Sequence, residues 1–281
     1  MASTPTPIRE LTADDLAAAH GLSRAVGWAH RLEDWRFVHG LGRGLAIDAD
    51  GVLVGTGLYW PFGDGFATLG LVIVAPERQG AGIGRRMMTG LLEAIGPRTT
   101  LLIATDAGAP LYEKLGFAAL GTVHQHQGEC IAPDEPLPAG WRIRPAMPAD
   151  VPVLAALDAR ATGLARDHVL HALLAIAEGV VLEQDGTPVG FAICRAFGRG
   201  RLVGPVVAPD DAAARALVGH WMGVHRGTFL RLDIPAGSDL GPWLAAHGMP
   251  EIAPGITMAR GPAPAAGRGA RLFGLINQAL G

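Results

Sequence analysis

The sequence predicts a mixed α/β fold made of two similar domains in tandem. Three observations support this prediction: a pattern of residues that occurs twice, a proline-rich segment between the two occurrences, and apolar runs whose spacing alternates between strand and helix periods. The chain has 281 residues, 49% hydrophobic and 17% charged, so it is long enough to fill two ordinary cores.

The repeated pattern keeps its order through both halves of the chain. The recurring segments are 8–9 with 143–144 and 51–55 with 186–190, both at an offset of 135, and 75–77 with 208–210 at an offset of 133. Chance rarely preserves such an order, so we expect a duplicated domain.

A proline-rich segment at 132–140 separates the copies, and its fixed φ angles and missing N–H donors suit neither helix nor sheet. We therefore predict a first domain over residues 1–131 and a second over residues 141–281. Near the end of the second, a Pro/Ala/Gly stretch at 261–269 precedes apolar residues at helical spacing. That spacing predicts a C-terminal tail helix over 272–280.

Four elements are predicted before the glycine-rich loop of the first copy. Asp14 is a favourable N-cap for the apolar run that follows it, which predicts a helix over 14–25. An Asp-Gly turn separates the runs 44–48 and 52–59, as is typical of a β-hairpin. The apolar and β-branched residues over 66–74 predict a further strand.

Four more elements are predicted after that loop. Apolar residues repeat at helical spacing over 83–95, and the Gly-Pro pair after them ends the helix. A buried strand is predicted over 99–104, a short helix over 110–115 ends at a glycine, and another strand starts at Phe117. Strands that alternate with helices predict a mixed sheet in each copy.

Charge and composition argue against several functional classes. The formal net charge is −3 without a run of like charge, so we expect no nucleic-acid or membrane-surface partner. The longest apolar runs are far shorter than the ~18 residues that a membrane helix needs. The first seven residues lack a secretory signal pattern, which predicts a cytoplasmic protein. Cys130 and Cys194 lie far apart and are expected to be buried thiols.

The glycine-rich stretch after the strand at 66–74 is the clearest sign of a binding site. Gly80, Gly82 and Gly84 lie at the start of a predicted helix, where small residues let backbone N–H groups converge and the helix dipole favours an anion. Their spacing matches neither the dinucleotide-binding pattern nor a P-loop. We expect a phosphate-binding loop of another kind, with a plain tight loop as the alternative.

A second motif, Leu-Tyr-Glu-Lys-Leu-Gly-Phe over 111–117, follows about thirty residues later. Together with Arg78-Gln79 and the glycines, it resembles the GNAT acetyltransferase superfamily over about the first 128 residues. The resemblance implies two GNAT-like mixed-sheet domains in tandem. One departure is visible, because many members carry Asn seven places before the tyrosine, where this chain has Thr105.

The resemblance implies acetyl-CoA as co-substrate and a cofactor site in the first copy. Loop amides would hold the CoA pyrophosphate, and a splayed strand would offer backbone groups to the pantetheine arm and one amide to the thioester carbonyl. The implied cofactor-binding residues are Val72, Ile73, Val74, Arg78, Gln79, Gly80, Ala81, Gly82, Ile83, Gly84 and Arg85.

The resemblance also implies that Tyr112 is the general acid of a direct attack by an amine. A tyrosine with a reference pKa near ~10 is protonated at neutral pH and can give its proton to the departing thiolate. A packing tyrosine is the alternative. The general base stays open between three kinds of candidate: the pair His124 and His126, a water relay, and the side chains of His30, Glu33, Asp34 and His39.

The expected acceptor is a primary amine of a small molecule or a peptide. Trp28, His30 and Trp35 are candidate acceptor-site residues, although aromatic side chains serve as core just as often. His124 and His126 have no evident third ligand, so we expect no metal. A protein that binds acyl-CoA as a sensor without turnover is the alternative function, and the motifs do not indicate an oligomeric state.

The second copy is expected to have lost the chemistry and to be a degenerate GNAT-like domain. At offsets of 133 and 132, the residues that replace Gly80, Gly82, Gly84 and Tyr112 are Ala213, Arg215, Leu217 and Leu244. Side chains at the three glycine positions would obstruct a pyrophosphate that must approach the backbone closely, and leucine has no proton to give.

Overall fold

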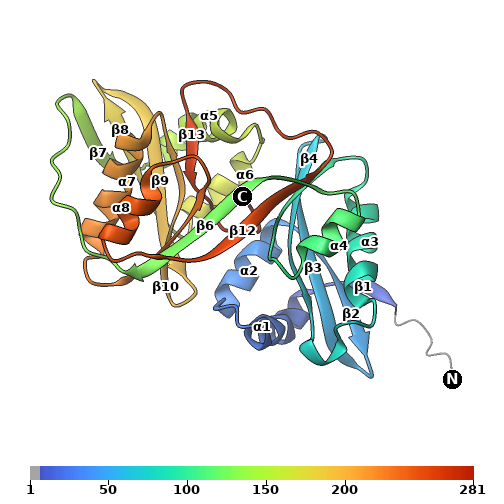
Figure 1. Cartoon of the computed structure of the whole chain (residues 1–281). Coiled ribbons are helices and arrows are strands. Elements are labelled where there is room, and N and C mark those ends of the chain that lie inside the picture. The colour runs from blue at the N-terminus through green and yellow to red at the C-terminus, as the bar shows by residue number, and fades with distance from the viewer. Residues whose placement is uncertain (1–6) are drawn as a thin grey trace. The chain divides into compact units, whose positions relative to one another are not determined.

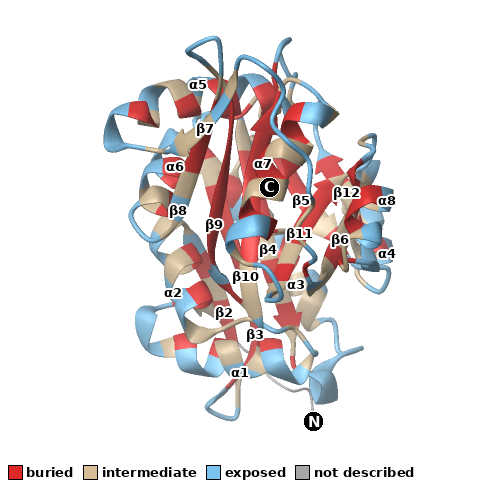
Figure 2. Ribbon diagram, turned by 90° about the vertical axis from the view of Figure 1, so that its left-hand side faces the viewer, coloured by how far each residue is buried: buried red, intermediate tan, exposed pale blue. Residues whose placement is uncertain are grey.

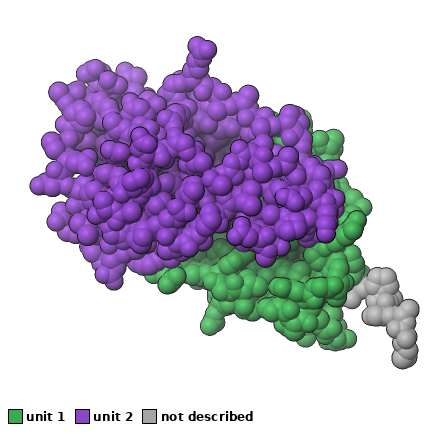
Figure 3. Space-filling model, in the orientation of Figure 1, with its two compact units in different colours: residues 1–102, 197–199, 280 green, residues 103–196, 200–279, 281 purple. Residues whose placement is uncertain are grey.

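The computed structural model describes residues 7–281, so the first six residues and the absence of a secretory pattern in them lie outside the described part. The chain divides into two compact units (Figure 3). Unit 1 runs to Leu102 and also includes the turn Phe197–Arg199 and Leu280, and unit 2 contains the rest. No helix among the described residues is long and apolar enough to cross a membrane.

Unit 1 contains an antiparallel sheet that ends in one parallel strand. Its strands are β1 (Ile8–Glu10), β2 (Arg43–Ala49), β3 (Val52–Phe62), β4 (Phe66–Val74) and the start of β5 (Thr99–Ala104). Neighbours from β1 to β4 pair antiparallel in chain order, and β5 pairs parallel to β4. Asp50 and Gly51 both have positive φ at the β2–β3 turn, as an Asp-Gly hairpin requires.

The helices of unit 1 are α1 (Leu16–Ala25), α2 (Leu32–Leu41) and α3 (Ile83–Ile95). The buried face of α3 includes Leu91, and a Cβ added to Gly57 of β3 would lie 2.6 Å from a methyl carbon of that leucine. The predicted cap Asp14 is wrong, because a 3₁₀ turn, Ala13–Asp15, precedes α1. The Thr12 amide there donates to the Asp15 carboxylate at 2.8 Å and closes a capping box.

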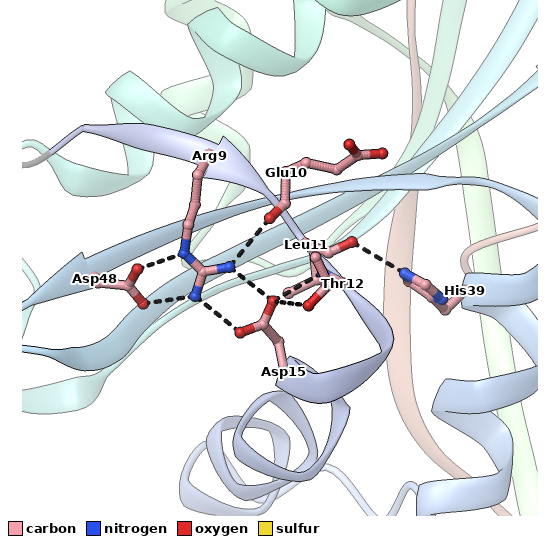
Figure 4. A network of polar contacts seen from close by, with 7 residues as sticks. All are labelled: Arg9, Glu10, Leu11, Thr12, Asp15, His39 and Asp48. Carbon is pink, nitrogen blue, oxygen red and sulfur yellow. Dashed lines mark hydrogen bonds and ion pairs between the residues drawn. The ribbon is translucent and has the colours of Figure 1, made fainter.

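Each copy anchors its first strand with the same ion cluster. Arg9 binds the carboxylates of Asp15 at 2.7 Å and Asp48 at 2.5 Å (Figure 4). The residues 135 positions on are Arg144, Asp150 and Glu183, and they form the same contacts. Exposed ion pairs contribute only about 0–1 kcal/mol each. The repeated residues thus tie the first strand of each copy to the turn and the strand that follow it.

Unit 2 contains the remaining elements. Its helices are α4 (Ala109–Lys114), α5 (Val151–Thr162), α6 (Asp167–Leu174), α7 (Asp211–Val224) and α8 (Leu240–Ala246). Its strands are β6 (Ala118–Glu129), β7 (Trp141–Pro145), β8 (Glu178–Gln184), β9 (Thr187–Phe197), β10 (Gly200–Ala208), β11 (Phe229–Pro235), β12 (Glu251–Arg260) and β13 (Arg271–Gly274). Strand β9 is buried over most of its length (Figure 2). Cys130 and Cys194 are buried free thiols, as predicted.

Strand β6 belongs to the first copy in sequence but pairs with strands of the second. It lies antiparallel to β11 on one side and to β12 on the other, and Figure 1 shows β6 and β12 running side by side. Residues 131–138 then form neither helix nor strand. Along the chain, the boundary between the compact units falls between residues 102 and 103, whereas the boundary between the sequence copies is predicted at 132–140. The predicted mixed α/β class is confirmed.

The tail helix predicted over 272–280 is wrong. Residues Arg271–Gly274 form β13, which pairs antiparallel with the end of β10. Strand β11 is in register only with Arg201 and Leu202 of β10, so the later part of β10 has backbone groups that still need partners. Apolar spacing in so short a segment fits a buried strand as well as a helix, and the open edge of β10 decides between them.

Candidate active site

Strands β4 and β5 separate part-way along their length. Their parallel register runs from Phe66↔Thr99 to Thr68↔Leu101 and does not continue to the next residue of either strand. The segment of β4 beyond this point includes 72–74, the residues expected to face the pantetheine arm. Unpaired backbone N–H and C=O groups on that edge of β4 need a partner, which a ligand can supply.

A β-bulge turns the backbone of β4 just after the strands part. Leu71 and Val72 together lie opposite Gly57 of β3, which shifts the register by one residue. Leu71 has a φ of 53°, a left-handed conformation that costs about 1–2 kcal/mol for a residue with a Cβ. The Thr56 hydroxyl donates to the Leu71 carbonyl at 3.0 Å and holds this backbone in place. Strained non-glycine backbone of this kind concentrates at functional sites.

The loop 75–82 leaves the N-terminus of α3 uncovered. Gly82 is the N-cap, with a φ of 78°, and no side chain caps the first turn. A Cβ added to Gly82 or to Gly80, which has a φ of 77°, would meet no heavy atom within 4 Å. The first-turn amides of a helix have no internal acceptor, and the dipole favours negative charge there. The backbone, the dipole and the open space all fit a pyrophosphate.

The side chains that flank this loop fall into two groups. Arg78 pairs with Asp50 at 3.0 Å, and the Gln79 amide donates to the Val74 carbonyl at 3.2 Å, which ties the loop to the end of β4. Arg85 lies in the first turn of α3 and lines a shallow groove of about 300 Å³. The rest of the groove is formed by Ile8, Arg86, Thr89, Gly90 and Glu93.

Tyr112 lies in α4, which belongs to unit 2, whereas the glycine loop belongs to unit 1. Burial raises the pKa of Tyr112 to about 12, and no hydrogen bond contributes to this shift. The ring packs against Phe117, with 6.0 Å between the ring centroids. It also covers Gly108, whose added Cβ would lie 3.0 Å from the Tyr112 Cε2 atom. The hydroxyl therefore keeps its proton at neutral pH.

Thr105 stands where many family members have asparagine, and its polar groups serve the turn before α4. Its carbonyl accepts hydrogen bonds from the Gly108 and Ala109 amides at 2.9 and 3.0 Å. Its hydroxyl accepts a third, from the Gly108 amide at 3.3 Å. The side chain at this position therefore stabilises the start of the helix that carries Tyr112.

The three aromatic acceptor candidates are brought together in unit 1. His30 meets both Trp28 and Trp35 edge-on, with ring centroids 5.7 and 6.5 Å apart. Trp35 is 1% exposed and its indole N–H donates to the Ser23 hydroxyl at 3.2 Å, so it is a core residue. Trp28 and His30 are half-buried in the loop between α1 and α2.

Several candidates for the general base hold structural contacts. His126 is buried and bonds to the Met249 carbonyl at 2.9 Å, while His124 contacts Glu251 at 2.9 Å. Asp34 is 3% exposed, and its carboxylate accepts a hydrogen bond from the Arg31 guanidinium at 2.8 Å. Between residues 7 and 281, no three His, Cys, Asp or Glu side chains lie close enough together to hold a metal ion.

The corresponding region of the second copy is closed. Eight residues, 75–82, connect β4 to α3, but only two, 209–210, connect β10 to α7. Asp210 caps α7, and its carboxylate accepts the Ala213 amide at 2.9 Å. Strand β13 pairs with β10 beyond the short β10–β11 register. The long loop, the helix start without a side-chain cap and the open strand edge of the first copy therefore have no counterpart in this region.

One sequence-based equivalence is wrong. Ala213, Arg215 and Leu217 were expected to replace the loop glycines, but all three lie inside α7. An alignment at a constant offset does not show that the loop before α7 is shorter than the loop before α3. The second copy therefore lacks the segment equivalent to most of the glycine-rich loop, and its glycines are not replaced by other residues. Asp210 before an apolar run is a recognisable N-cap signal, and it could have revealed where the helix begins.

The comparisons with known proteins agree with this geometry. Models of the GNAT acetyltransferase domain match residues 41–119 and 154–274. The uncharacterised N-acetyltransferase YitH of Bacillus subtilis is 30% identical over 173 residues, 60% of this chain and 60% of that protein. The matched region thus spans less than two thirds of that relative.

Two solved structures resemble the fold over nearly its whole length. A candidate acetyltransferase from Pyrococcus horikoshii has a TM-score of 0.81 at 20% identity, over 100% of this chain and 98% of its own. A tandem GNAT protein from the clavulanic acid biosynthesis pathway has a TM-score of 0.64 at 15% identity, over 92% and 99%. At these identities the likeness concerns the fold, and the two domains in tandem are as predicted.

Proposed function

Because the chain belongs to the GNAT family of acetyltransferases, we propose that it is an acetyl-CoA-dependent N-acetyltransferase acting on a primary amine of a small molecule or a peptide. The observation that carries the proposal is the uncovered N-terminus of α3 after a strand whose outer edge is unpaired and bulged. We also propose a single cofactor site, in the first copy, because Asp210 caps the equivalent helix of the second copy and β13 pairs with the later part of β10.

The residues of the first copy divide the binding of acetyl-CoA between them. The amides of residues 80–84 would hold the pyrophosphate, with Arg78, Gln79 and Arg85 beside it. The backbone of 72–74 would hold the pantetheine arm. The co-substrate supplies an activated acyl group as a thioester, and an amide of the bulged segment would stabilise charge on its carbonyl oxygen.

The proposed reaction moves one acyl group and one proton. The neutral amine nitrogen forms a bond to the thioester carbonyl carbon, and the carbon–sulfur bond breaks. The departing sulfur would take a proton from the Tyr112 hydroxyl. The amine nitrogen loses a proton as the amide forms, and that proton would return to the Tyr112 oxygen, so that one proton passes from nitrogen to sulfur overall. A pKa of about 12 means that this proton is present throughout the physiological pH range. We assign no side chain as the base that takes the amine proton, because Asp34 and His126 hold structural contacts. We expect water to relay the amine proton.

The test is a thiol-release assay with acetyl-CoA and a panel of primary amines and peptides, combined with calorimetric titration of CoA. We expect one CoA per chain and amine-dependent thiol release. Binding without release for any amine would favour the sensor alternative, and absence of CoA binding would refute both. The cytoplasmic location and the absence of nucleic-acid and membrane partners remain predictions.

A further inference from the structure

The turn between β9 and β10 is part of unit 1, and it contacts the loop between α1 and α2. The Gly198 amide donates to the Asp34 carboxylate at 3.0 Å. The Phe197 ring meets His30 edge-on, with 5.7 Å between centroids. A segment that belongs to the second copy in sequence therefore touches one candidate acceptor-site residue, His30, and one candidate base, Asp34.

Asp34 is the centre of this contact. Its carboxylate also accepts from the Arg31 amide at 2.9 Å and from the Arg31 guanidinium at 2.8 Å. Burial alone would raise the pKa of Asp34, but the hydrogen bonds from Arg31 and Gly198 outweigh it and lower the pKa below its usual value. The group is thus ionised at neutral pH. A buried carboxylate needs its donors, so the loss of Gly198 from this contact is unfavourable.

Gly198 is needed at the turn for two reasons. Its φ of 55° is left-handed, and an added Cβ would lie 2.8 Å from the Ala29 carbonyl oxygen. Gly186, at the β8–β9 turn, has a φ of 78° but no heavy atom within 4 Å of an added Cβ. Alanine is strained by a positive φ at both glycines, but only at Gly198 does its Cβ also clash with the loop between α1 and α2. Comparing the two variants therefore separates the effect of backbone strain from the effect of the contact with that loop.

We propose that the turn Phe197–Arg199 is a positioning element for the loop 26–31 and thereby sets the affinity for the acceptor amine. This rests on the proposed function. The loop forms neither helix nor strand. It is held on one side by α1, where the His20 ring bonds to the His30 carbonyl at 2.9 Å. The turn supplies the contact to Ala29 and to the ring of His30.

Hydrogen exchange measures the positioning directly and needs no acceptor. We expect Gly198→Ala to speed exchange of the amides of 28–31 by about tenfold, and Gly186→Ala to leave them unchanged. Exchange at 80–86 should be the same in both variants. Phe197→Leu keeps an apolar side chain but removes the ring contact, so it serves if Gly198→Ala does not fold. Unchanged exchange at 28–31 in the folded variants would overturn the proposal.

Kinetics measure the consequence, with the best acceptor of the amine panel. In Gly198→Ala we expect the KM for the amine to rise about five- to tenfold, while the KM for acetyl-CoA stays within about twofold. Gly186→Ala should change neither. An unchanged amine KM, or an equal rise in both constants, would contradict a positioning role. If the natural chain acetylates no amine, the proposed function fails, and the exchange result still decides whether the turn holds the loop.

Discussion

Replacing Gly82 with alanine tests the proposed pyrophosphate cradle, which is formed by the backbone amides of residues 80–84 at the N-terminus of α3. The residue has a φ of 78°, so alanine there costs about 1–2 kcal/mol of folding stability. The added methyl group meets no protein atom within 4 Å, so any effect beyond the loss of stability has to be an effect on CoA binding. If it blocks one hydrogen bond from a backbone amide to a charged phosphate, about 1.5–3 kcal/mol is lost. That is a loss of about ten- to a hundredfold in CoA affinity.

The other end of the same helix provides a matched control. Gly96 is the C-cap of α3, with a φ of 73° and no heavy atom within 4 Å of an added Cβ. Gly96 has a ψ of −143° and Gly82 a ψ of 2°, so alanine is more strained at Gly96 than in the left-handed helical conformation of Gly82. Gly96→Ala should therefore lower the melting temperature at least as much as Gly82→Ala but leave CoA affinity unchanged. Calorimetric titration of CoA and thermal unfolding measure the two effects. If Gly82→Ala binds CoA as tightly as the natural chain, the proposed role of the loop amides is refuted. If both variants lose affinity equally, the loss follows stability and not the loop.

Three further predictions concern the acid, the second copy and pH. Tyr112→Phe should lower kcat by about a hundredfold or more and leave the CoA dissociation constant within about twofold, as rapid-mixing kinetics and titration would measure; a matching loss of affinity would contradict its role as acid. Asp210→Ala should destabilise the chain by about 1 kcal/mol in urea unfolding, with one CoA still bound per chain; a second equivalent would disprove the single site. Asp34→Asn should lower stability most above about pH 4, with the difference narrowing as acid protonates the native carboxylate, because the native pKa lies below the unfolded value. A pH-independent difference in unfolding free energy would contradict that assignment.

Local patterns predicted the elements that form the cradle. The strand at 66–74, the helix at 83–95 and the strand at 99–104 have the predicted bounds, because alternation, helical spacing and the Gly-Pro stop act within a few residues. The loop glycines are likewise visible in the sequence, since a left-handed N-cap such as Gly82 favours glycine.

Features that depend on distant partners could not be predicted in this way. The bulge at Leu71 has no glycine to mark it and depends on the register with β3. Strand β13 depends on an open edge of β10 more than sixty residues earlier. The contact of Gly198 with Asp34 joins residues 164 positions apart, and no single-sequence pattern encodes it.

The placement of β6 between β11 and β12 constrains the history of this chain. After a gene duplication, an exchange of this kind makes each copy necessary to the other, because cutting the chain at 132–140 would separate β6 from both strands that pair with it. Either fragment would present bare sheet edges prone to aggregation. Selection can then retain the second copy for as long as its strands are needed for folding, whatever its role in binding or catalysis.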